Sequence, residues 1–315
     1  MKKIKKIAIF GACGFIGTNL SFYLLRNKRN KVYAFDNLQT GAKSNLFLLN
    51  KYNNFSFFKF DLTKNSTKNL DKFDLIINLA CPASPIYYQA DPVKTLLTSV
   101  IGTHKLLEKS RNDNSIYIHS STSEIYGDPI ISPQKESYFG NVNPFGPRSC
   151  YDEGKRAAES LCYDFINQYN TDARIIRIFN TYGPYMRYDD GRVISNFIIQ
   201  SLKGSPITIY GDGLQTRSFC YIDDLINAIQ MLFYKKVNMP INLGNPKEFD
   251  MIKVAKKILS LTNSSSELIF KPLPKDDPKQ RKPDISLAKK YLNWAPKINL
   301  ELGLCKTIDY FKKII

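Results

Sequence analysis

Short apolar runs alternate with longer segments of helical period through the first 180 residues. The runs are rich in Ile, Val and Phe and lack strict alternation, which is typical of parallel strands covered on both faces. This order of elements predicts an α/β fold built on a doubly wound parallel sheet of the Rossmann type. The predicted strands are Ile7–Phe10, Val32–Asp36, Phe55–Asp61, Leu75–Ala80, Ile116–Ser120 and Ile175–Phe179, with helices between them such as Ile16–Leu25 and Pro92–Lys109.

The pattern changes after Gly183-Pro184 to shorter elements with more Pro, Gly and charge. Ile241–Asn245 predicts one further strand and Ile252–Leu261 a helix, while the Pro-rich, charged stretch Lys271–Pro283 predicts a loop. We therefore expect two joined parts. The first is an NAD-binding Rossmann domain, residues 1–181, to which residues 222–248 return; the second is a smaller C-terminal substrate-binding part, residues 182–221 and 249–315.

The composition is that of an ordinary globular protein, because 43% of the 315 residues are hydrophobic and 23% are charged. The formal net charge of +17 is high. It admits three interpretations: a field that attracts anionic ligands, nucleic-acid binding, or a surface of solvated lysines. The basic residues are spread along the chain, which argues against nucleic acid as a partner.

Cysteine and histidine usage argues against disulfides and metal. The six cysteines show no CxxC spacing, which indicates free thiols in a reducing compartment, and His104 and His119 are too few for a histidine-based metal site. The first residues, Met1–Phe10, imitate a signal peptide, but their apolar run passes directly into a glycine loop. No other stretch approaches the roughly 18 apolar residues of a membrane span. We expect a cytoplasmic protein without a membrane partner.

Three glycines lie between the first predicted strand and the first predicted helix. Gly11 permits a tight turn, Gly14 lets the backbone approach a pyrophosphate, and Gly17 allows close helix packing. The N-terminus of the following helix favours the phosphate charge. The motif predicts a dinucleotide site; the alternative is a purely structural turn.

Carboxylates at the ends of the next two strands refine the cofactor. Asp36 can accept hydrogen bonds from an adenosine ribose and would repel a ribose phosphate, which favours NAD over NADP. Asp61 and Leu62 would flank the adenine, although Asp61 is equally suited to cap a helix.

Tyr151 and Lys155 lie one helical turn apart and can present both side chains on one face. A cation about 4 Å from a tyrosine hydroxyl supplies about 4 kcal/mol at an effective dielectric of about 20, which makes the phenol a better base. We expect Tyr151 to remove a substrate hydroxyl proton, Lys155 to hold the nicotinamide ribose, and Thr122 to orient the reacting oxygen. The alternatives are an exposed i,i+4 contact for the pair and a helix cap for Thr122.

These motifs resemble the extended short-chain dehydrogenase/reductases that act on nucleotide sugars, and within that group the UDP-glucuronate decarboxylases. The likeness covers nearly the whole chain. The matching segments are Leu79–Pro85, Ser121–Pro129, Asn143–Lys155, Arg177–Pro184, Asp190–Val193, Gln215–Arg217 and Arg281–Ile285.

The resemblance implies a redox-neutral reaction that gives UDP-xylose. Tyr151 would oxidise the fourth carbon of the sugar with NAD, and the resulting β-keto acid would lose carbon dioxide before hydride returns. Glu124 and Arg281 would position the ring and promote decarboxylation, while Ser84 and Tyr88 would line the pocket around the carboxylate.

The resemblance also implies the ligand contacts. The expected nucleotide-side residues are arginines and an amide, which suit an anionic substrate, although each arginine could instead form a surface ion pair. The expected substrate contacts are Ser84, Tyr88, Asn180, Arg192, Tyr210, Arg217 and Arg281. The expected cofactor contacts are Gly11, Gly14, Phe15, Ile16, Gly17, Asp36, Asn37, Thr40, Gly41, Asp61, Leu62, Leu79, Cys81, Thr98, Ser120, Tyr151, Lys155 and Thr181.

Two segments depart from the family pattern. Cys81 stands where Ser is common, and Ile86-Tyr87 stands where Pro-Asn often occurs, so the fit of the substrate is open at both.

Other functions remain open. A nucleotide-sugar 4,6-dehydratase commonly has an acidic residue at the position of Ser123, and a GDP-mannose-type dehydratase prefers NADP, which Asp36 disfavours. A 4-epimerase would not require Arg281. A dinucleotide-sensing or nucleic-acid-binding protein on the same fold would not need Tyr151 and Lys155. The helix that carries this pair usually forms the dimer interface in the family, so we expect a homodimer.

Overall fold

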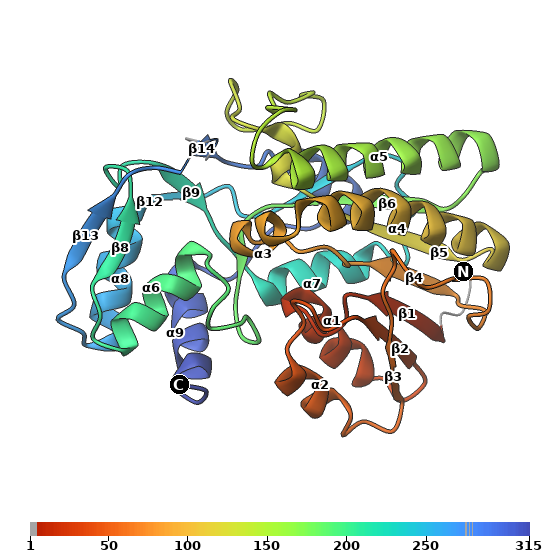
Figure 1. The fold of residues 1–315 in the computed structure, drawn as a ribbon, viewed down its shortest axis with the longest axis horizontal. Helices are drawn as coiled ribbons and strands as arrows, with labels where there is room; N and C mark the ends of the chain where they lie inside the picture. The colour runs from red at the N-terminus through yellow and green to blue at the C-terminus, as the bar shows by residue number, and fades with distance from the viewer. Residues whose placement is uncertain (1–4, 275, 277, 279) are drawn as a thin grey trace.

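The computed structural model describes residues 5–274, 276, 278 and 280–315, and its centre is a seven-stranded parallel sheet (Figure 1). The strand order is β11-β6-β5-β4-β1-β2-β3, and every pairing in this sheet is parallel. The expected doubly wound fold is therefore confirmed. The strands are β1 (Lys6–Phe10), β2 (Lys31–Asp36), β3 (Phe55–Lys59), β4 (Leu75–Asn78), β5 (Ile116–Thr122), β6 (Ala173–Ile178) and β11 (Ile241–Leu243).

Alternate residues of the central strands supply two separate cores, one on each face of the sheet. Ile7 and Ile9 of β1 pack with Leu20 on one face, while Ala8 and Phe10 pack with Leu106 on the other. Burial on both faces explains why the strand sequences lack polar alternation. Helices α1 (Phe15–Leu25) and α7 (Ile222–Met231) pack together on the first face, and α4 (Pro92–Asp113) and α5 (Ser149–Tyr169) pack together on the second.

Three shorter elements follow the carboxyl ends of strands. They are α2 (Lys43–Leu49) after β2, α3 (Pro85–Ala90) after β4, and the 3-10 turn η1 (Ser123–Tyr126) after β5. The long helix α4 starts sharply because Asp91 accepts a hydrogen bond from the N–H of Lys94 (3.2 Å) and Pro92 occupies its first turn.

The last strand of the sheet, β11, comes from a late part of the chain. It pairs with β6, and the buried side chain of Asn242 donates to the carbonyls of Gln134 (3.0 Å) and Asp284 (3.1 Å). Residues far apart in sequence thus meet at this edge of the sheet.

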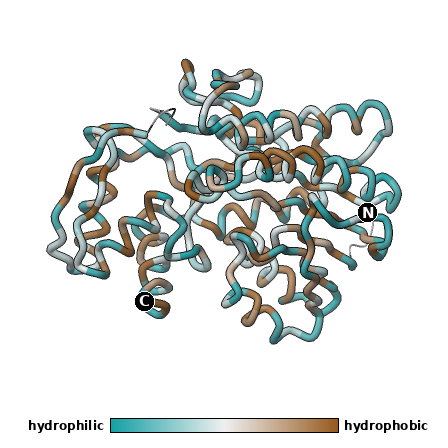
Figure 2. The backbone as a smooth tube through the Cα atoms, viewed as in Figure 1, coloured by the Kyte–Doolittle hydropathy of each residue, from teal (hydrophilic) through white to brown (hydrophobic). Residues whose placement is uncertain are grey.

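Most of the remaining elements, among them α6, α8 and β13, form a smaller group to one side of the sheet, on the left of Figure 1. Figure 2 shows apolar residues concentrated where its helices and strands face each other. The stretch expected to be a loop, Lys271–Pro283, contains a two-residue strand. The elements are β7 (Thr181–Tyr182), α6 (Val193–Leu202), β8 (Ile207–Tyr210), β9 (Thr216–Ser218), β10 (Cys220–Tyr221), β12 (Glu248–Asp250), α8 (Met251–Thr262), β13 (Leu268–Lys271), β14 (Gln280–Arg281), η2 (Ala288–Leu292) and α9 (Leu300–Phe311).

One of these small sheets brings two arginines together. Strand β9 pairs with β12 on one side and with β14 on the other, and the second pairing sets Arg281 beside Arg217. Arg281 thereby reaches the carboxyl end of the central sheet although it lies 158 positions after Ser123, whose carbonyl it contacts.

Candidate active site

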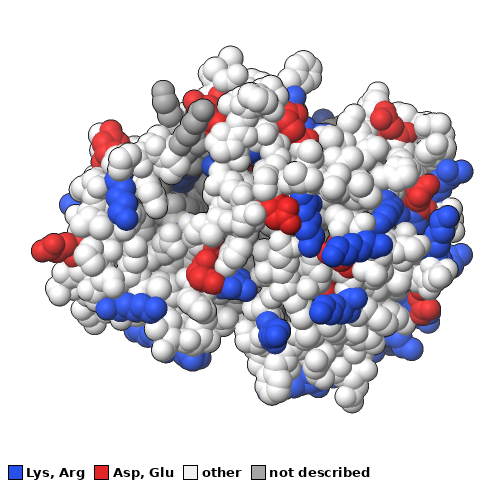
Figure 3. Space-filling model, viewed as in Figure 1, with Lys and Arg blue, Asp and Glu red and all other residues white. Residues whose placement is uncertain are grey.

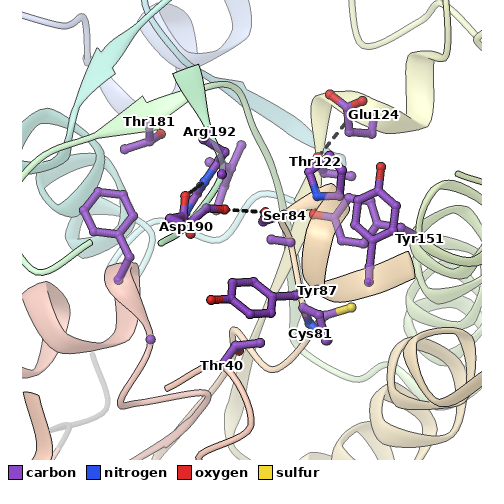
Figure 4. A pocket seen from close by; sticks show the side chains of 18 of the residues that line it. Thr40, Cys81, Ser84, Tyr87, Thr122, Glu124, Tyr151, Thr181, Asp190 and Arg192 are labelled. Carbon is purple, nitrogen blue, oxygen red and sulfur yellow. Dashed lines mark hydrogen bonds and ion pairs between the residues drawn. The ribbon is translucent and has the colours of Figure 1, made fainter. Parts of the chain in front are cut away.

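A cavity of about 600 Å³ opens beyond the carboxyl ends of β1, β4 and β5 (Figure 4). All of the expected site residues line it except Gly41. Gly41 lies against the Asp36 carboxylate. A Cβ added to Gly41 would be only 2.8 Å from that carboxylate, so there is no room for a side chain. The cavity thus gathers residues spread from Gly11 to Arg281.

The glycine loop forms one wall of the cavity. Gly11 has a φ of +82°, and a Cβ on Gly17 would lie 2.2 Å from the Gly11 carbonyl oxygen, so the turn requires both glycines. A Cβ on Gly14 would come no closer than 3.4 Å to a protein atom. Packing within the protein therefore does not require a glycine at position 14, and the missing side chain leaves space on the cavity side.

Asp36 links the end of β2 to this loop. Its carboxylate accepts hydrogen bonds from the N–H groups of Cys13 (2.9 Å) and Leu38 (2.7 Å). Burial raises its pKa, and these two hydrogen bonds counteract the rise. Each carboxylate oxygen keeps a second acceptor position for a ligand hydroxyl.

Asp61 is a turn residue that also faces the cavity. It accepts hydrogen bonds from the Thr63 hydroxyl (2.6 Å) and from Asn37 (3.2 Å), and forms an ion pair with Lys94 (3.0 Å). Burial opposes the charge, but Thr63, Lys94 and Asn37 outweigh it and lower the pKa of Asp61. Asp61 therefore caps its own turn while it lines the cavity with Leu62.

Tyr151, Thr122 and Lys155 meet where β5 ends and α5 begins. Thr122 favours the ionised form of the Tyr151 hydroxyl and thereby lowers its pKa, although burial outweighs this effect. The Thr122 hydroxyl also accepts a hydrogen bond from the N–H of Glu124 (3.2 Å), which caps η1. The Lys155 ammonium donates to the Ser120 carbonyl (2.7 Å) and lies 5.9 Å from the centre of the Tyr151 ring. Tyr151 and Lys155 thus lie on neighbouring turns of α5 beside the end of β5, and Thr122 caps η1.

The electrostatics of Tyr151 differ from the sequence-based argument. Burial raises the pKa of Tyr151 and lowers that of Lys155, because the charged form of each group loses water. This desolvation opposes the attraction between the two groups that their helical spacing predicts. Tyr88 contributes to it, because its ring stacks on Tyr151 with centroids 5.1 Å apart and an interplanar angle of 6°.

Glu124 lies beside this group and is held by two arginines. Arg148 donates to one of its carboxylate oxygens, and the Nη2 of Arg281 lies 3.0 Å from the same oxygen. Burial opposes the negative charge, but Arg281 and Arg148 lower the pKa of Glu124 to about 2. Glu124 is therefore a carboxylate at neutral pH and cannot donate a proton as an acid.

Arg281 is the largest of the fully buried side chains, with 1% exposure. Its Nη1 donates to the carbonyls of Ser123 and Gly127, both at 2.9 Å. Arg281 thus holds the η1 turn in place through two backbone carbonyls and also contacts the Glu124 carboxylate.

Asp152 is a second buried carboxyl group in this cluster. Its Oδ2 lies 3.9 Å from the Nε of Arg148, and its Oδ1 has no hydrogen-bond partner among the described residues. Burial and the neighbouring Glu124 raise the pKa of Asp152 to about 8, so it is mainly protonated at neutral pH.

Asp152→Asn should flatten the pH dependence of stability. The folded state keeps a proton on Asp152 that the unfolded chain loses above its ordinary pKa, so this group's contribution to stability falls as pH rises towards about 8. Between about pH 6 and pH 8.5, wild type should therefore lose roughly a few degrees of Tm more than Asp152→Asn. Thermal unfolding at the two pH values measures the difference, and equal losses in both proteins would contradict the assignment.

Two loops meet across the cavity near the glycine loop. The Ser84 hydroxyl donates to the Asp190 carbonyl, and the Tyr87 hydroxyl donates to the Asp189 carbonyl (3.3 Å). The Arg187 guanidinium lies 5.4 Å from the Tyr87 ring centre. Figure 4 shows Ser84 and Asp190 joined in this way, with Tyr151 and Thr122 on the opposite side. Tyr87, one of the residues that depart from the family pattern, therefore joins α3 to the loop that carries Asp189.

The expected nucleotide-side residues also line the cavity. Arg192 pairs with Asp190 and lies 5.7 Å from the Phe15 ring centre, and Arg217 donates to the Thr216 carbonyl (2.9 Å). Both arginines therefore have protein partners in the cavity wall. The remaining expected residues also line it, namely Phe15, Ile16, Asn37, Thr40, Leu79, Cys81, Thr98, Asn180, Thr181 and Tyr210.

Sequence reasoning missed Arg148 and Asp152. Both lie within the matched segment Asn143–Lys155, beside Tyr151 and Lys155. The signal that could have found them is their position, because Arg148 is the N-cap residue of α5 and Asp152 lies in its first turn.

The sequence pattern of the NAD dependent epimerase/dehydratase family matches residues 7–244. The chain belongs to this family. The family expected from the motifs is thereby confirmed. Relatives within it include UDP-glucuronic acid decarboxylase 3 of Arabidopsis thaliana, 48% identical over 95% of this chain and 86% of that protein. UDP-glucuronic acid decarboxylase 1 of Xenopus tropicalis is 45% identical over 99% of this chain and 73% of that protein.

Solved structures of the family share the whole fold. UDP-glucose 4-epimerase of Thermotoga maritima, solved with UDP-glucose, has a TM-score of 0.90 and 28% identity, covering 98% of this chain and 99% of that one. UDP-glucuronic acid 4-epimerase of Bacillus cereus, solved with UDP-glucuronic acid and NAD, has a TM-score of 0.88 and 29% identity, covering 98% of this chain and 100% of that one.

The surface and the helices add two observations. Lys and Arg side chains are scattered over the face shown in Figure 3 and lie among acidic ones. Among the residues that the structure describes, no helix is long and apolar enough to cross a membrane.

Proposed function

We propose that this chain decarboxylates UDP-glucuronate to UDP-xylose through a 4-keto intermediate, with NAD as a redox partner and no net oxidation. One observation carries the proposal: the cavity sets the proton-transfer group of Tyr151 and Thr122 beside the carboxylate–guanidinium cluster of Glu124, Arg148 and Arg281. The first group suits oxidation of a hydroxyl, and the second suits a substrate that carries a negative charge. The nearly full-length decarboxylase relatives support the same substrate.

The cavity walls fit NAD. The first N–H groups of α1 have no partners within the helix, and Gly14 leaves space beside them for a pyrophosphate. Asp36 can accept hydrogen bonds from the adenosine ribose and would repel a phosphate on it. When bound, NAD accepts hydrogen from the fourth carbon of the sugar and returns it at the end of the reaction.

Tyr151 would take the proton of the sugar hydroxyl while Thr122 holds the oxygen. The Lys155 ammonium, fixed on the Ser120 carbonyl, stays near the ring and stabilises the phenolate that must form transiently. Because burial raises the pKa of Tyr151, its deprotonation must be coupled to arrival of the substrate and the positive charge of the oxidised nicotinamide. Tyr151 would therefore act as a base only when the substrate and the oxidised cofactor are both bound.

Loss of carbon dioxide follows from the chemistry of the substrate. Oxidation at the fourth carbon creates a ketone β to the carboxylate, and the electron pair released by decarboxylation delocalises into that ketone. Glu124 would position the ring as a carboxylate, because Arg148 and Arg281 keep it ionised. Reprotonation of the ring and reduction of the ketone then give the pentose.

Incubation of the purified protein with UDP-glucuronate tests the proposal. We expect carbon dioxide release and a stoichiometric amount of UDP-xylose, with no net change in the amount of reduced cofactor. Formation of UDP-galacturonate without carbon dioxide would identify a 4-epimerase instead. Conversion of a neutral hexose nucleotide, with UDP-glucuronate untouched, would favour a 4,6-dehydratase or another epimerase. Salt-sensitive DNA retention without NAD binding would indicate the non-enzymatic alternative.

We propose a homodimer formed through α4 and α5. The outward faces of these adjacent helices expose Val93 (68%), Leu97 (39%), Ile101 (38%) and Tyr163 (66%), an unusual amount of apolar surface for solvated helices. Leu97→Glu should therefore convert the dimer to monomer, because it places a charge at the centre of this surface. Light scattering after gel filtration measures the mass, and a monomeric wild type would refute the interface.

We propose a cytoplasmic location, supported by six cysteines that are all free, three of them buried. Such thiols suit a reducing compartment. Fractionation of cells that express the native chain tests the location, and recovery in a secreted fraction would contradict it.

A further inference from the structure

We propose that Tyr87 and Arg187 form a latch that closes the cofactor side of the cavity and slows the exchange of NAD. The latch joins α3 to residues 187–192, here called the strap, which lead into α6. Ile86 and Tyr87, which make the contacts of α3 with the strap described below, form one of the two segments that depart from the family pattern. The latch is therefore a feature of this chain and not of the motifs that it shares with its relatives.

The strap starts from a fixed point beside the glycine loop. The buried side-chain amide of Asn45 donates to the carbonyls of Cys13, in the glycine loop, and of Tyr185, both at 3.3 Å. Met186 follows in the chain and is buried in the core. This end of the strap is thus held against the wall that we expect to bind the pyrophosphate.

The strap then reaches α3 on the other side of the cavity. The Tyr87 hydroxyl donates to the Asp189 carbonyl (3.3 Å). Gly191 packs directly against the Ile86 side chain, because a Cβ added to Gly191 would lie 2.4 Å from the Cδ1 of Ile86. Both departing residues of α3 therefore contact the strap.

Arg187 holds the strap in the shape that this contact requires. Its guanidinium donates two hydrogen bonds to the Asp189 carboxylate (2.7 and 2.6 Å) and lies 5.4 Å from the centre of the Tyr87 ring. The first interaction fixes the turn that presents the Asp189 carbonyl to Tyr87, and the second attracts the ring through a cation–π contact. Tyr87, Arg187 and Asp189 thus act as one unit.

The cavity that fits NAD continues beneath this unit. Tyr87 and Arg187 line it together with Gly14 of the glycine loop. Figure 4 shows Tyr87 between Thr40, one of the expected cofactor contacts, and the contact that Ser84 makes with the strap. A dinucleotide that extends from the glycine loop to the proton-transfer group would therefore lie under the latch and could leave only after it opens.

The latch contacts suit a part that opens and closes. The Arg187 and Asp189 side chains are 32% and 39% exposed, and the hydrogen bond from Tyr87 is also exposed, whereas Asn45 and Met186 at the anchored end are buried. Exposed contacts of this kind are the first to break when a loop opens locally. Opening is thus expected at the α3 side, while the end beside the glycine loop stays in place.

Slow exchange has a chemical reason. In the proposed redox-neutral reaction, the hydrogen taken from the sugar is returned to that same sugar, so the reduced cofactor must remain until the ketone has been reduced. Early loss of the cofactor would leave a 4-keto sugar behind. This reason rests on the proposed function, whereas the latch itself can be tested with the cofactor alone.

Cofactor exchange in the absence of sugar nucleotide tests the proposal. Purified protein loaded with NADH is mixed rapidly with excess NAD, and the fluorescence of bound NADH gives the release rate; equilibrium titration gives the Kd. Tyr87→Phe keeps the ring and removes the hydroxyl, so release should be roughly fivefold faster, the effect of one neutral hydrogen bond. Arg187→Gln should speed release by roughly tenfold, because it removes the cation and its paired hydrogen bonds to Asp189.

The Kd distinguishes a latch from a direct contact with the cofactor. The latch contacts lie within the protein, so entry and exit require the same opening, and both variants should keep the Kd within about twofold of wild type. Tyr188→Phe is the matched control, since Tyr188 belongs to the strap and is 56% exposed, and it should leave the release rate unchanged.

Two results would overturn the proposal. The first is release within twofold of wild type in both Tyr87→Phe and Arg187→Gln. The second is faster release matched by an equally weaker Kd, which would make these side chains direct contacts of the cofactor. Faster release at an unchanged Kd, in a protein that forms no UDP-xylose, would refute the proposed reaction and leave the latch standing.

Discussion

Tyr151→Phe should lower the rate of carbon dioxide release from UDP-glucuronate by about a thousandfold, within the range that a positioned acid–base group contributes. The hydroxyl is the only group removed, and it is the group proposed to take the proton from the sugar. The ring remains, so its stacking on Tyr88 and the packing of α5 should be kept. Turnover measured under saturating substrate gives the effect.

Two measurements separate this loss from unfolding. Thermal stability and NAD affinity of Tyr151→Phe should match wild type. Tyr169→Phe is the matched control, since Tyr169 is the last residue of the same helix and is 39% exposed, and it should keep full turnover. Residual activity of Tyr151→Phe within tenfold of wild type would reject the assigned role.

Arg281→Ala should slow carbon dioxide loss more than the first oxidation, so that reduced cofactor and the 4-keto sugar accumulate together. Without Arg281 the carbonyls of Ser123 and Gly127 lose a buried donor and Glu124 loses one of its two cations. The disrupted buried pair should also cost about 3–5 kcal/mol of stability. Absorbance of the reduced cofactor, read against carbon dioxide release in a single turnover, measures the partition.

Arg174→Ala distinguishes loss of stability from loss of function. Arg174 is 4% exposed and pairs with Asp172 at 2.7 Å, but it lies at the start of β6, at the opposite end of the sheet from the cavity. It should lower stability without changing the partition between oxidation and decarboxylation. If Arg281→Ala slows only the oxidation, the role given to Arg281 is wrong.

The fold was predictable because its strands are buried on both faces. All seven residues of β5 are buried, and so are the four of β4, so each appears in the sequence as a short, mainly apolar run in which polar residues do not alternate with apolar ones. The glycine loop was predictable for a related reason, since Gly11 and Gly17 have no room for a side chain. Steric requirements of this kind involve only a few neighbouring residues, so they can be recognised in the sequence.

The electrostatics of the site were not predictable in the same way. The pairing of Tyr151 and Lys155 follows from helical spacing, but the burial that raises the tyrosine pKa comes from distant segments such as the one carrying Tyr88. The partners of Glu124 lie 24 and 157 positions further along the chain, at Arg148 and Arg281. Spacing within one element cannot reveal such contacts.

The role of individual hydroxyls also depended on tertiary structure. Ser84 was expected beside the sugar carboxylate, and it does line the cavity, but its hydroxyl donates to the Asp190 carbonyl. Gly41, also expected to contact the cofactor, packs against the Asp36 carboxylate. The position of Ser84 along the chain was informative, while the direction of its contact was set by the distant loop that carries Asp190.

The late position of β11 has a consequence for how the protein is made. Its residues, Ile241–Leu243, complete the edge of the sheet beside β6, and Asn242 is buried against Gln134 and Asp284. During synthesis, β6 must therefore wait with an unpaired edge until Ile241–Leu243 have been made and have left the ribosome. Pairings between such distant segments form slowly, and an open edge invites association with other nascent chains. Translation speed and chaperone supply should thus govern the yield of native protein more than the intrinsic strength of its core.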